Sequence, residues 1–227
     1  MHSRVEVWTA RIDADDDAIR ALASLLDDEE RAKAARFHFE ADRRRCIVAR
    51  GALRTLLARR LGRDARALRF VYGPQGKPAL EGGELEFNVS HSGDCVAVAI
   101  ADGSPIGLDV ECPKPMSDRV ALAERFFAAE EADVVKRAAA DGAAAAFYSI
   151  WTAKESVIKA AGGGLSIELD SFVVTPLRDG LTPVKNRGRN PQLDGWSVLP
   201  LPSIGGCYAA VAARGSGWTA VVGELVA

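Results

Sequence analysis

Asp109 and Glu111, in the segment IGLDVE, are two acids whose spacing could form a metal site. In a strand both side chains point to one face, while Ile106, Leu108 and Val110 point to the other. Two adjacent negative charges on a strand of buried type require a positive partner. With a third carboxylate they would form oxygen ligands for Mg²⁺, which commonly shares its shell with substrate phosphates. The alternative is an exposed strand edge.

The segment IWTAKESVIKAAGGGLS, which begins at Ile150, supplies a possible third carboxylate. Trp151, Glu155 and Lys159 are four residues apart, so on a helix they lie along one stripe. The same Glu-to-Lys spacing is also that of an ordinary helix-supporting ion pair, worth about 0.2–0.5 kcal/mol. Spacing alone therefore leaves both interpretations open.

His91 and Lys77 are two further polar residues placed where a phosphate could be bound. His91 follows the strand-like run LEFNVS and precedes Gly93, so its ring could donate to a phosphate oxygen. Lys77 lies in the turn GPQGKP. A structural histidine and a solvated turn lysine are the alternatives. With three histidines in the chain, a metal site built from several histidines is not expected.

Basic residues are concentrated in one part of the chain. Residues 31–69 hold thirteen Arg and Lys and three Asp and Glu, a local net charge of +10 in a chain of net charge −2. Such a block indicates a local site for a polyanion rather than general nucleic-acid binding. A solvated, arginine-rich helix face is the alternative for most of these side chains.

The 227 residues are 48% hydrophobic and 26% charged, as in an ordinary globular protein. The four cysteines form no C-x-x-C pair, which argues against a zinc site or a small disulfide scaffold and fits a reducing cytoplasm. We expect neither a signal peptide nor a membrane span. The P-loop, Rossmann, α/β-hydrolase and zincin motifs are absent from the sequence.

The order of predicted elements occurs twice along the chain. Each half reads as a strand, two helical stretches and three strand-like runs, which predicts two similar α+β lobes with a site in the cleft between them. The predicted lobes are residues 1–103 and 104–227. The predicted strands are 5–12, 68–73, 85–90 and 95–101, then 106–111, 171–176, 196–201 and 207–213, with 218–226 as a tail; the helical stretches are 16–38, 40–61, 117–138 and 143–161.

GKP, FNVSHSG, IGLDVE and WTAKESVIKAAGGGLS followed by LDSF, in this order, resemble the surfactin-type 4′-phosphopantetheinyl transferases. The resemblance covers residues 31–172. It implies an α+β pseudo-dimer with the active site between its lobes. It also implies transfer of the 4′-phosphopantetheine arm of coenzyme A to a serine of an apo acyl- or peptidyl-carrier protein, with Mg²⁺ as cofactor and 3′,5′-ADP released. The carrier would serve fatty acid, polyketide or non-ribosomal peptide synthesis.

The resemblance also implies residue roles. Asp109, Glu111 and Glu155 would bind the metal, Glu155 would act as base, and Lys159 would bind the diphosphate. His91 would hold a phosphate oxygen and Ser90 would contact the nucleotide end. Lys77 and Pro78 would lie at the adenosine, with Lys33 and Arg45 at the 3′-phosphate; Glu30 stands where a basic residue is expected.

The resemblance implies coenzyme A and a carrier protein as partners. Because a two-lobed chain can build the site alone, we expect a monomer, and from the cysteines and the charge distribution we expect a cytoplasmic protein with no nucleic-acid or membrane partner. The segment RVALAERFF, residues 119–127, could meet an acidic carrier or form an ordinary amphipathic helix. Three rival functions are another Mg²⁺-dependent phosphotransferase, a catalytically silent binding module, and an RNA-binding protein. The last lacks interleaved aromatic residues.

Overall fold

The computed structural model describes residues 4–138, 140–175, 180–188 and 190–225. Within these residues the chain is a mixed α+β protein with six α-helices, two four-stranded sheets and two small two-stranded sheets. The small sheets pair β2 (Phe70–Tyr72) with β3 (Pro78–Leu80), and β7 (Phe172–Val173) with β9 (Lys185–Asn186).

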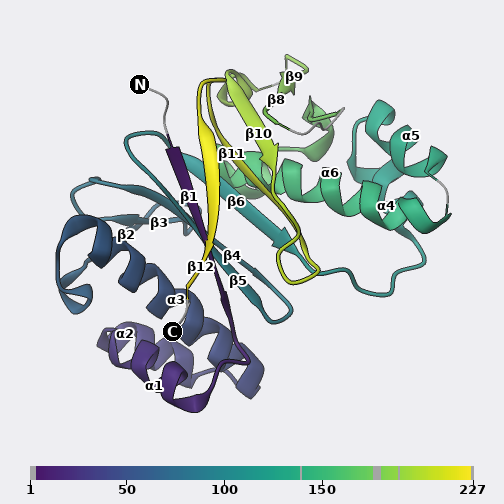
Figure 1. The fold of residues 1–227 in the computed structure, drawn as a ribbon. Coiled ribbons are helices and arrows are strands. Elements are labelled where there is room, and N and C mark those ends of the chain that lie inside the picture. The colour runs from purple at the N-terminus through teal and green to yellow at the C-terminus, as the bar shows by residue number, and fades with distance from the viewer. Residues whose placement is uncertain (1–3, 139, 176–179, 189, 226–227) are drawn as a thin grey trace.

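The first large sheet has the strand order β12-β1-β5-β4. All seven residues of β5 are buried, as expected from its unbroken apolar run. The sheet is covered by α3, against which α1 and α2 pack (Figure 1). Its elements are β1 (Arg4–Arg11), β4 (Glu86–Ser92), β5 (Cys95–Ala101), β12 (Thr219–Glu224), α1 (Asp16–Ser24), α2 (Asp28–Ala35) and α3 (Glu40–Leu61).

The second large sheet has the strand order β6-β11-β10-β8. The long helix α6 packs across β6, β11 and β10, and α4 and α5 pack against α6 on the side of the molecule away from α3 (Figure 1). The elements of this half are β6 (Ile106–Glu111), β8 (Thr182–Pro183), β10 (Trp196–Pro200), β11 (Tyr208–Arg214), α4 (Arg119–Phe126), α5 (Ala129–Arg137) and α6 (Ala140–Ala161).

The two sheets share a core. Val7 and Ala99 of the first sheet pack in one buried cluster with Leu108 and Val211 of the second, and Trp218 joins them. These side chains exclude water from both sheets at once and so hold the sheets together. At their boundary β4 of the first sheet lies beside β6 of the second. Four of the predicted site residues lie on those two strands: Ser90, His91, Asp109 and Glu111.

The predicted helices and strands occur with several differences. Of the predicted strand 171–176, Phe172–Val173 forms β7, and residue 176 lies outside the described residues. The short strands β3, β8 and β9 were not predicted. The stretch 16–38 is two helices because Asp27 starts a new one: its side chain accepts from the Glu30 N–H, and the Glu30 carboxylate accepts from the Asp27 N–H. The stretch 117–138 also divides, at Phe127. The predicted tail, 218–226, is the strand β12, which pairs in parallel with β1 in the first sheet rather than remaining with the second half. No periodicity in the sequence indicates this return.

One disulfide joins Cys112 at the end of β6 to Cys207 at the start of β11. The prediction that the cysteines are reduced thiols is wrong for this pair. The antiparallel register of the two strands sets Tyr208 opposite Glu111, so these cysteines face each other with Cα atoms 4.1 Å apart. Cys46 and Cys95 are free thiols. Among the described residues, none of the helices has the length and apolar character needed to cross a membrane.

Candidate active site

The close approach of α6 to β6 brings the predicted acids together. Gly107 makes it possible, because a β-carbon at this position would lie 2.0 Å from the carbonyl oxygen of Ser156. With the helix seated on the strand in this way, Asp109 and Glu111 face the same small cavity as Glu155 and Lys159. The cavity has a volume of about 300 Å³.

Asp109 and Lys159, which both line this cavity, form an ion pair. Lys159 Nζ donates to Asp109 Oδ1 over 2.6 Å and to Ser90 Oγ over 3.1 Å. Burial raises the pKa of Asp109 to about 6, and the ammonium of Lys159 opposes that shift. The other oxygen, Oδ2, is buried without a hydrogen-bond partner. A buried, unpaired carboxylate oxygen is suited to a cation.

Glu155 lies one turn of α6 before Lys159 and is half-buried. Burial raises its pKa, which the positive charge of Lys159 counteracts and the negative charge of Glu111 reinforces. Trp151 lines the cavity a further turn away and stacks on Phe147, with ring centroids 5.7 Å apart. The stripe Trp151, Glu155, Lys159 therefore faces a cavity, as the functional interpretation of its spacing requires.

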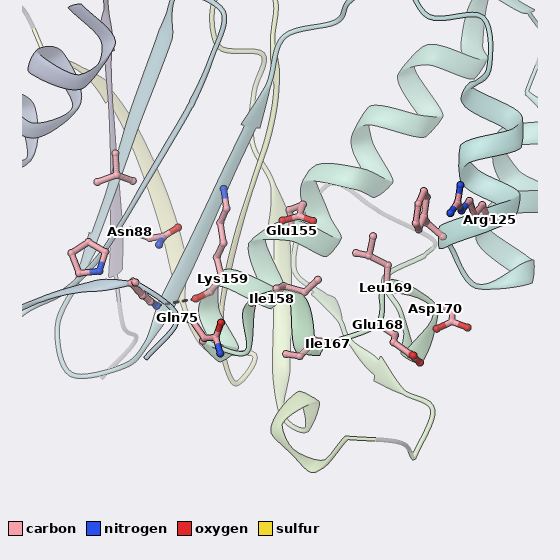
Figure 2. Close-up of a pocket in the computed structure, with 17 residues that line it drawn as sticks. Gln75, Asn88, Arg125, Glu155, Ile158, Lys159, Ile167, Glu168, Leu169 and Asp170 are labelled. Carbon is pink, nitrogen blue, oxygen red and sulfur yellow. Dashed lines mark hydrogen bonds between the residues drawn. The ribbon is translucent and has the colours of Figure 1, made fainter. Parts of the chain in front are cut away.

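A second cavity of about 720 Å³ adjoins the first, since Val89, Glu155 and Lys159 line both. Figure 2 shows Gln75 and Asn88 on one side of it and Arg125, Leu169 and Asp170 on the other. This larger space, which adjoins the cavity of Asp109, Glu111 and Glu155, could hold a ligand next to a bound cation. Its remaining labelled wall residues are Ile158, Ile167 and Glu168.

The donor set of the small cavity suits a hard divalent cation in its chemistry. Asp109, Glu111 and Glu155 offer only oxygen ligands, and one of those oxygens is buried and unpaired. Among the described residues, no three His, Cys, Asp or Glu side chains converge as a ready-made metal centre. The ammonium of Lys159 instead occupies Asp109 Oδ1.

Both halves of the chain match known families. Residues 11–102 match the family described as 4′-phosphopantetheinyl transferase, N-terminal, and residues 105–201 match the 4′-phosphopantetheinyl transferase superfamily. The chain is 34% identical over 224 residues to the 4′-phosphopantetheinyl transferase HetI of Nostoc sp. (strain PCC 7120), covering 96% of this chain and 91% of HetI. It is 37% identical over 158 residues to the 4′-phosphopantetheinyl transferase Sfp of Bacillus subtilis (strain 168), covering 69% of each.

The chain belongs to the 4′-phosphopantetheinyl transferase superfamily and is an enzyme of that class. The resemblance found in the motifs is thereby confirmed.

The structure of this 4′-phosphopantetheinyl transferase collects most of the predicted site residues. Those lining the small cavity are Ser90, His91, Asp109, Glu111, Glu155 and Lys159, and those lining the large one include Lys77 and Pro78. Lys33, exposed on α2, and Arg45, on α3, are not among the described residues that line either cavity.

Arg45 and His91 lie close together at the β4–β5 turn. The Arg45 guanidinium donates to the Gly93 carbonyl oxygen over 3.0 Å through its Nη2. The surrounding protein lowers the pKa of His91, and the charge of Arg45 adds to this effect. Arg44 instead donates to the carbonyl oxygens of Ile12 and Ala14. Of these two arginines of the basic block, Arg45 is the one whose charge acts on His91.

Lys77 has an internal role that the sequence did not indicate. Its Nζ donates to the carbonyl oxygens of Ile106 and Lys159, over 3.0 and 2.9 Å, so it ties the turn before β3 to β6 and to the end of α6. Burial lowers the pKa of this ammonium. Two of the three N–H donors of this ammonium are therefore directed to backbone carbonyl oxygens.

Glu30 and Lys154 are buried charges that sequence reasoning left without a role. Glu30 forms ion pairs with Arg50 and Arg54, at 3.0 and 2.7 Å, and so holds α2 against α3. Lys154 is fully buried, pairs with Glu131 at 2.6 Å, and donates to two carbonyl oxygens beside the wall of the large cavity. The sequence could have indicated the burial of Lys154, because it lies four residues from both Ile150 and Ile158 and therefore on the same buried face of the helix.

Proposed function

We propose that the chain transfers the 4′-phosphopantetheine arm of coenzyme A to a serine of an apo acyl- or peptidyl-carrier protein, with Mg²⁺ as cofactor and 3′,5′-ADP as product. The observation that carries the proposal is the grouping of Asp109, Glu111, Glu155 and Lys159 around one small cavity that opens to a larger one. Transfer of a phosphoryl group depends on such positioning and charge neutralisation.

Asp109, Glu111 and Glu155 would hold Mg²⁺, which when bound offsets the charge of the coenzyme A diphosphate. Glu155 orients the carrier serine and accepts its proton, directly or through water. Lys159 exchanges Asp109 for the diphosphate and stabilises the charge on the leaving phosphate. The serine oxygen forms a bond to the phosphorus nearer the pantetheine, and the bond from that phosphorus to the bridging oxygen breaks.

The nucleotide end would be bound by the first half of the chain. His91 donates to a phosphate oxygen, Ser90 supports Lys159 beside it, and Lys33 and Arg45 bind the 3′-phosphate. Pro78 and the stem of Lys77 form a wall for the adenosine.

On this proposal the two large sheets belong to the two lobes of a pseudo-dimer, residues 1–103 and 104–227, with β12 returning to the first sheet and the reaction taking place between them. A single chain then supplies the whole site, so we propose a monomer.

The carrier would approach along residues 119–127, where Arg125 and Phe126 line the large cavity and Phe127 is buried in the core. The cytoplasmic location stays a prediction.

Intact-mass spectrometry tests this function. An apo carrier protein incubated with the chain, coenzyme A and Mg²⁺ should gain the mass of one phosphopantetheine arm, and EDTA should abolish the gain. A gain that persists in EDTA would rule out the metal. With no gain on acyl- or peptidyl-carriers, a coenzyme A titration separates a selective enzyme, which binds, from a silent homologue, which does not.

A further inference from the structure

The boundary between the two large sheets is closed by side chains. β4 ends the first sheet and β6 begins the second, and the two strands run in the same direction side by side. Three alternate residues of β4 accept from alternate backbone N–H groups of β6 and of the residue that follows it: Leu108 N donates to Asn88 Oδ1 over 2.8 Å, Val110 N to Ser90 Oγ over 3.2 Å, and Cys112 N to Ser92 Oγ over 3.1 Å. We call these three contacts the seam.

Each serine of the seam also holds one of the acids. Ser90 Oγ donates to Asp109 Oδ1 over 3.1 Å, and Ser92 Oγ donates to Glu111 Oε2 over 2.8 Å. A hydroxyl has a single proton to donate. Because its oxygen already accepts from the β6 backbone, that proton is directed to the carboxylate. The arrangement repeats two residues further on because both strands have a period of two.

Ser90 and Ser92 differ in one respect. Lys159 also contacts Asp109 and Ser90, so the orientation of Asp109 has two supports. Among the described residues, Ser92 is the one hydrogen-bond partner of the Glu111 side chain, and Ser92 is 8% exposed, so little water competes with this bond. Loss of the Ser92 hydroxyl therefore affects the orientation of Glu111 more directly than loss of the Ser90 hydroxyl affects Asp109.

We propose that Ser92 is a positioning residue that orients Glu111 for the divalent cation. The inference rests on the metal site of the proposed function and gives a role to Ser92, a residue of the motif FNVSHSG to which the sequence analysis assigned none. A partner that orients a metal ligand is commonly worth 10–100-fold in metal affinity. Ser92 does this while linking the two sheets, so the geometry of the metal site depends on the boundary between them.

Two variants of equal size test the proposal. Ser92→Thr keeps the hydroxyl, whereas Ser92→Val replaces it by a methyl group. Mn²⁺ is titrated into the full chain saturated with coenzyme A, and free Mn²⁺ is measured by electron paramagnetic resonance. We expect the Mn²⁺ Kd to rise about 10-fold or more for Val and to stay within about threefold for Thr. If Val does not fold, Ser92→Ala removes the hydroxyl without adding volume and is interpreted in the same way.

Unfolding midpoints separate positioning from support of the fold. Val leaves the Cys112 N–H without its acceptor, so a purely structural role would lower the unfolding midpoint and leave the Mn²⁺ Kd unchanged. That result would overturn the role of Ser92. The proposed metal site would still stand if Asp109→Ala abolishes Mn²⁺ binding. If the unsubstituted chain binds no Mn²⁺, the proposed metal site fails and this inference fails with it. In a Glu111→Gln background, Val should cause no further rise in Kd; a further tenfold rise would also contradict the inference.

Discussion

Gly107 on β6 lies against the backbone of Ser156 on α6 so closely that a β-carbon at residue 107 would be 2.0 Å from the Ser156 carbonyl oxygen. No side-chain movement can relieve this contact, since the obstacle is backbone. The distance between the acids of β6 and the charged residues of α6 is therefore set by the absence of a side chain at one position.

Gly107→Ala should force α6 away from β6 and separate Asp109 from Lys159. We expect a loss of about 3 kcal/mol or more in the free energy of unfolding, because overpacking against backbone relaxes poorly. Urea unfolding measures the loss. Gly142→Ala, in the first part of the same helix, is the control: its β-carbon would lie 3.8 Å from the β-carbon of Ala138, an ordinary contact, and alanine favours the helix. Equal losses in the free energy of unfolding for the two substitutions would show that the contact of Gly107 with Ser156 does not limit the approach of α6 to β6.

Glu155→Gln should separate binding from turnover. The amide keeps the size of the side chain and cannot accept the serine proton, so we expect turnover to fall by about 10²–10⁴. Coenzyme A binding, measured by calorimetry in the presence of Mg²⁺, should remain within a few-fold. Full activity of this variant would remove Glu155 from the role of base.

Asp109→Ala should act at binding instead. It removes the buried oxygen that has no hydrogen-bond partner and the principal ion-pair partner of Lys159. The coenzyme A Kd of the unsubstituted chain should rise when EDTA replaces Mg²⁺, whereas that of the variant should be weak under both conditions. A variant that still responds to Mg²⁺ would show that the cation is held elsewhere.

Lys154 and Glu131 form a buried ion pair whose partners cannot be removed one at a time. Either Lys154→Met or Glu131→Gln should cost about 3–5 kcal/mol of stability, because the remaining group is left buried without its partner. The double variant Lys154→Met, Glu131→Leu should recover much of this loss. The exposed pair Lys136 and Glu124 is the control, and Lys136→Met should leave the unfolding midpoint essentially unchanged. Additive losses in the double variant would contradict the coupling.

The sequence predicted the residues that share a face better than it predicted which elements are neighbours. The periods of 2 and 3.6 correctly placed Asp109 with Glu111 and Glu155 with Lys159, since those relationships are local. The parallel pairing of β12 with β1, and the contact of Ser92 with Glu111, join segments separated in the chain. No local pattern encodes them. Lys154 was predictable in part. Its place on the buried face of α6 follows from helical spacing, whereas its partner Glu131 lies on α5 and could not be inferred from a local pattern.

The disulfide between Cys112 and Cys207 can be detected by counting reactive thiols. The chain purified without reductant and then unfolded should show two reactive thiols, Cys46 and Cys95, and four after reduction. Reduction should lower stability by about 2–4 kcal/mol, because the bond closes a long loop that is otherwise free in the unfolded chain. Reductant should have no effect on the unfolding midpoint of the double variant Cys112→Ser, Cys207→Ser.

Reduction also has a consequence for the site, since Cys112 follows Glu111 directly and its N–H donates to Ser92. Loosening the end of β6 should raise the Mn²⁺ Kd, as Ser92→Val does. The rise should be smaller than for Ser92→Val, because the Ser92 hydroxyl is still present. Four reactive thiols in the unreduced chain would mean that the bond does not form in solution. In that case the seam alone would fix the position of Glu111, and Ser92→Val should have its full effect with or without reductant.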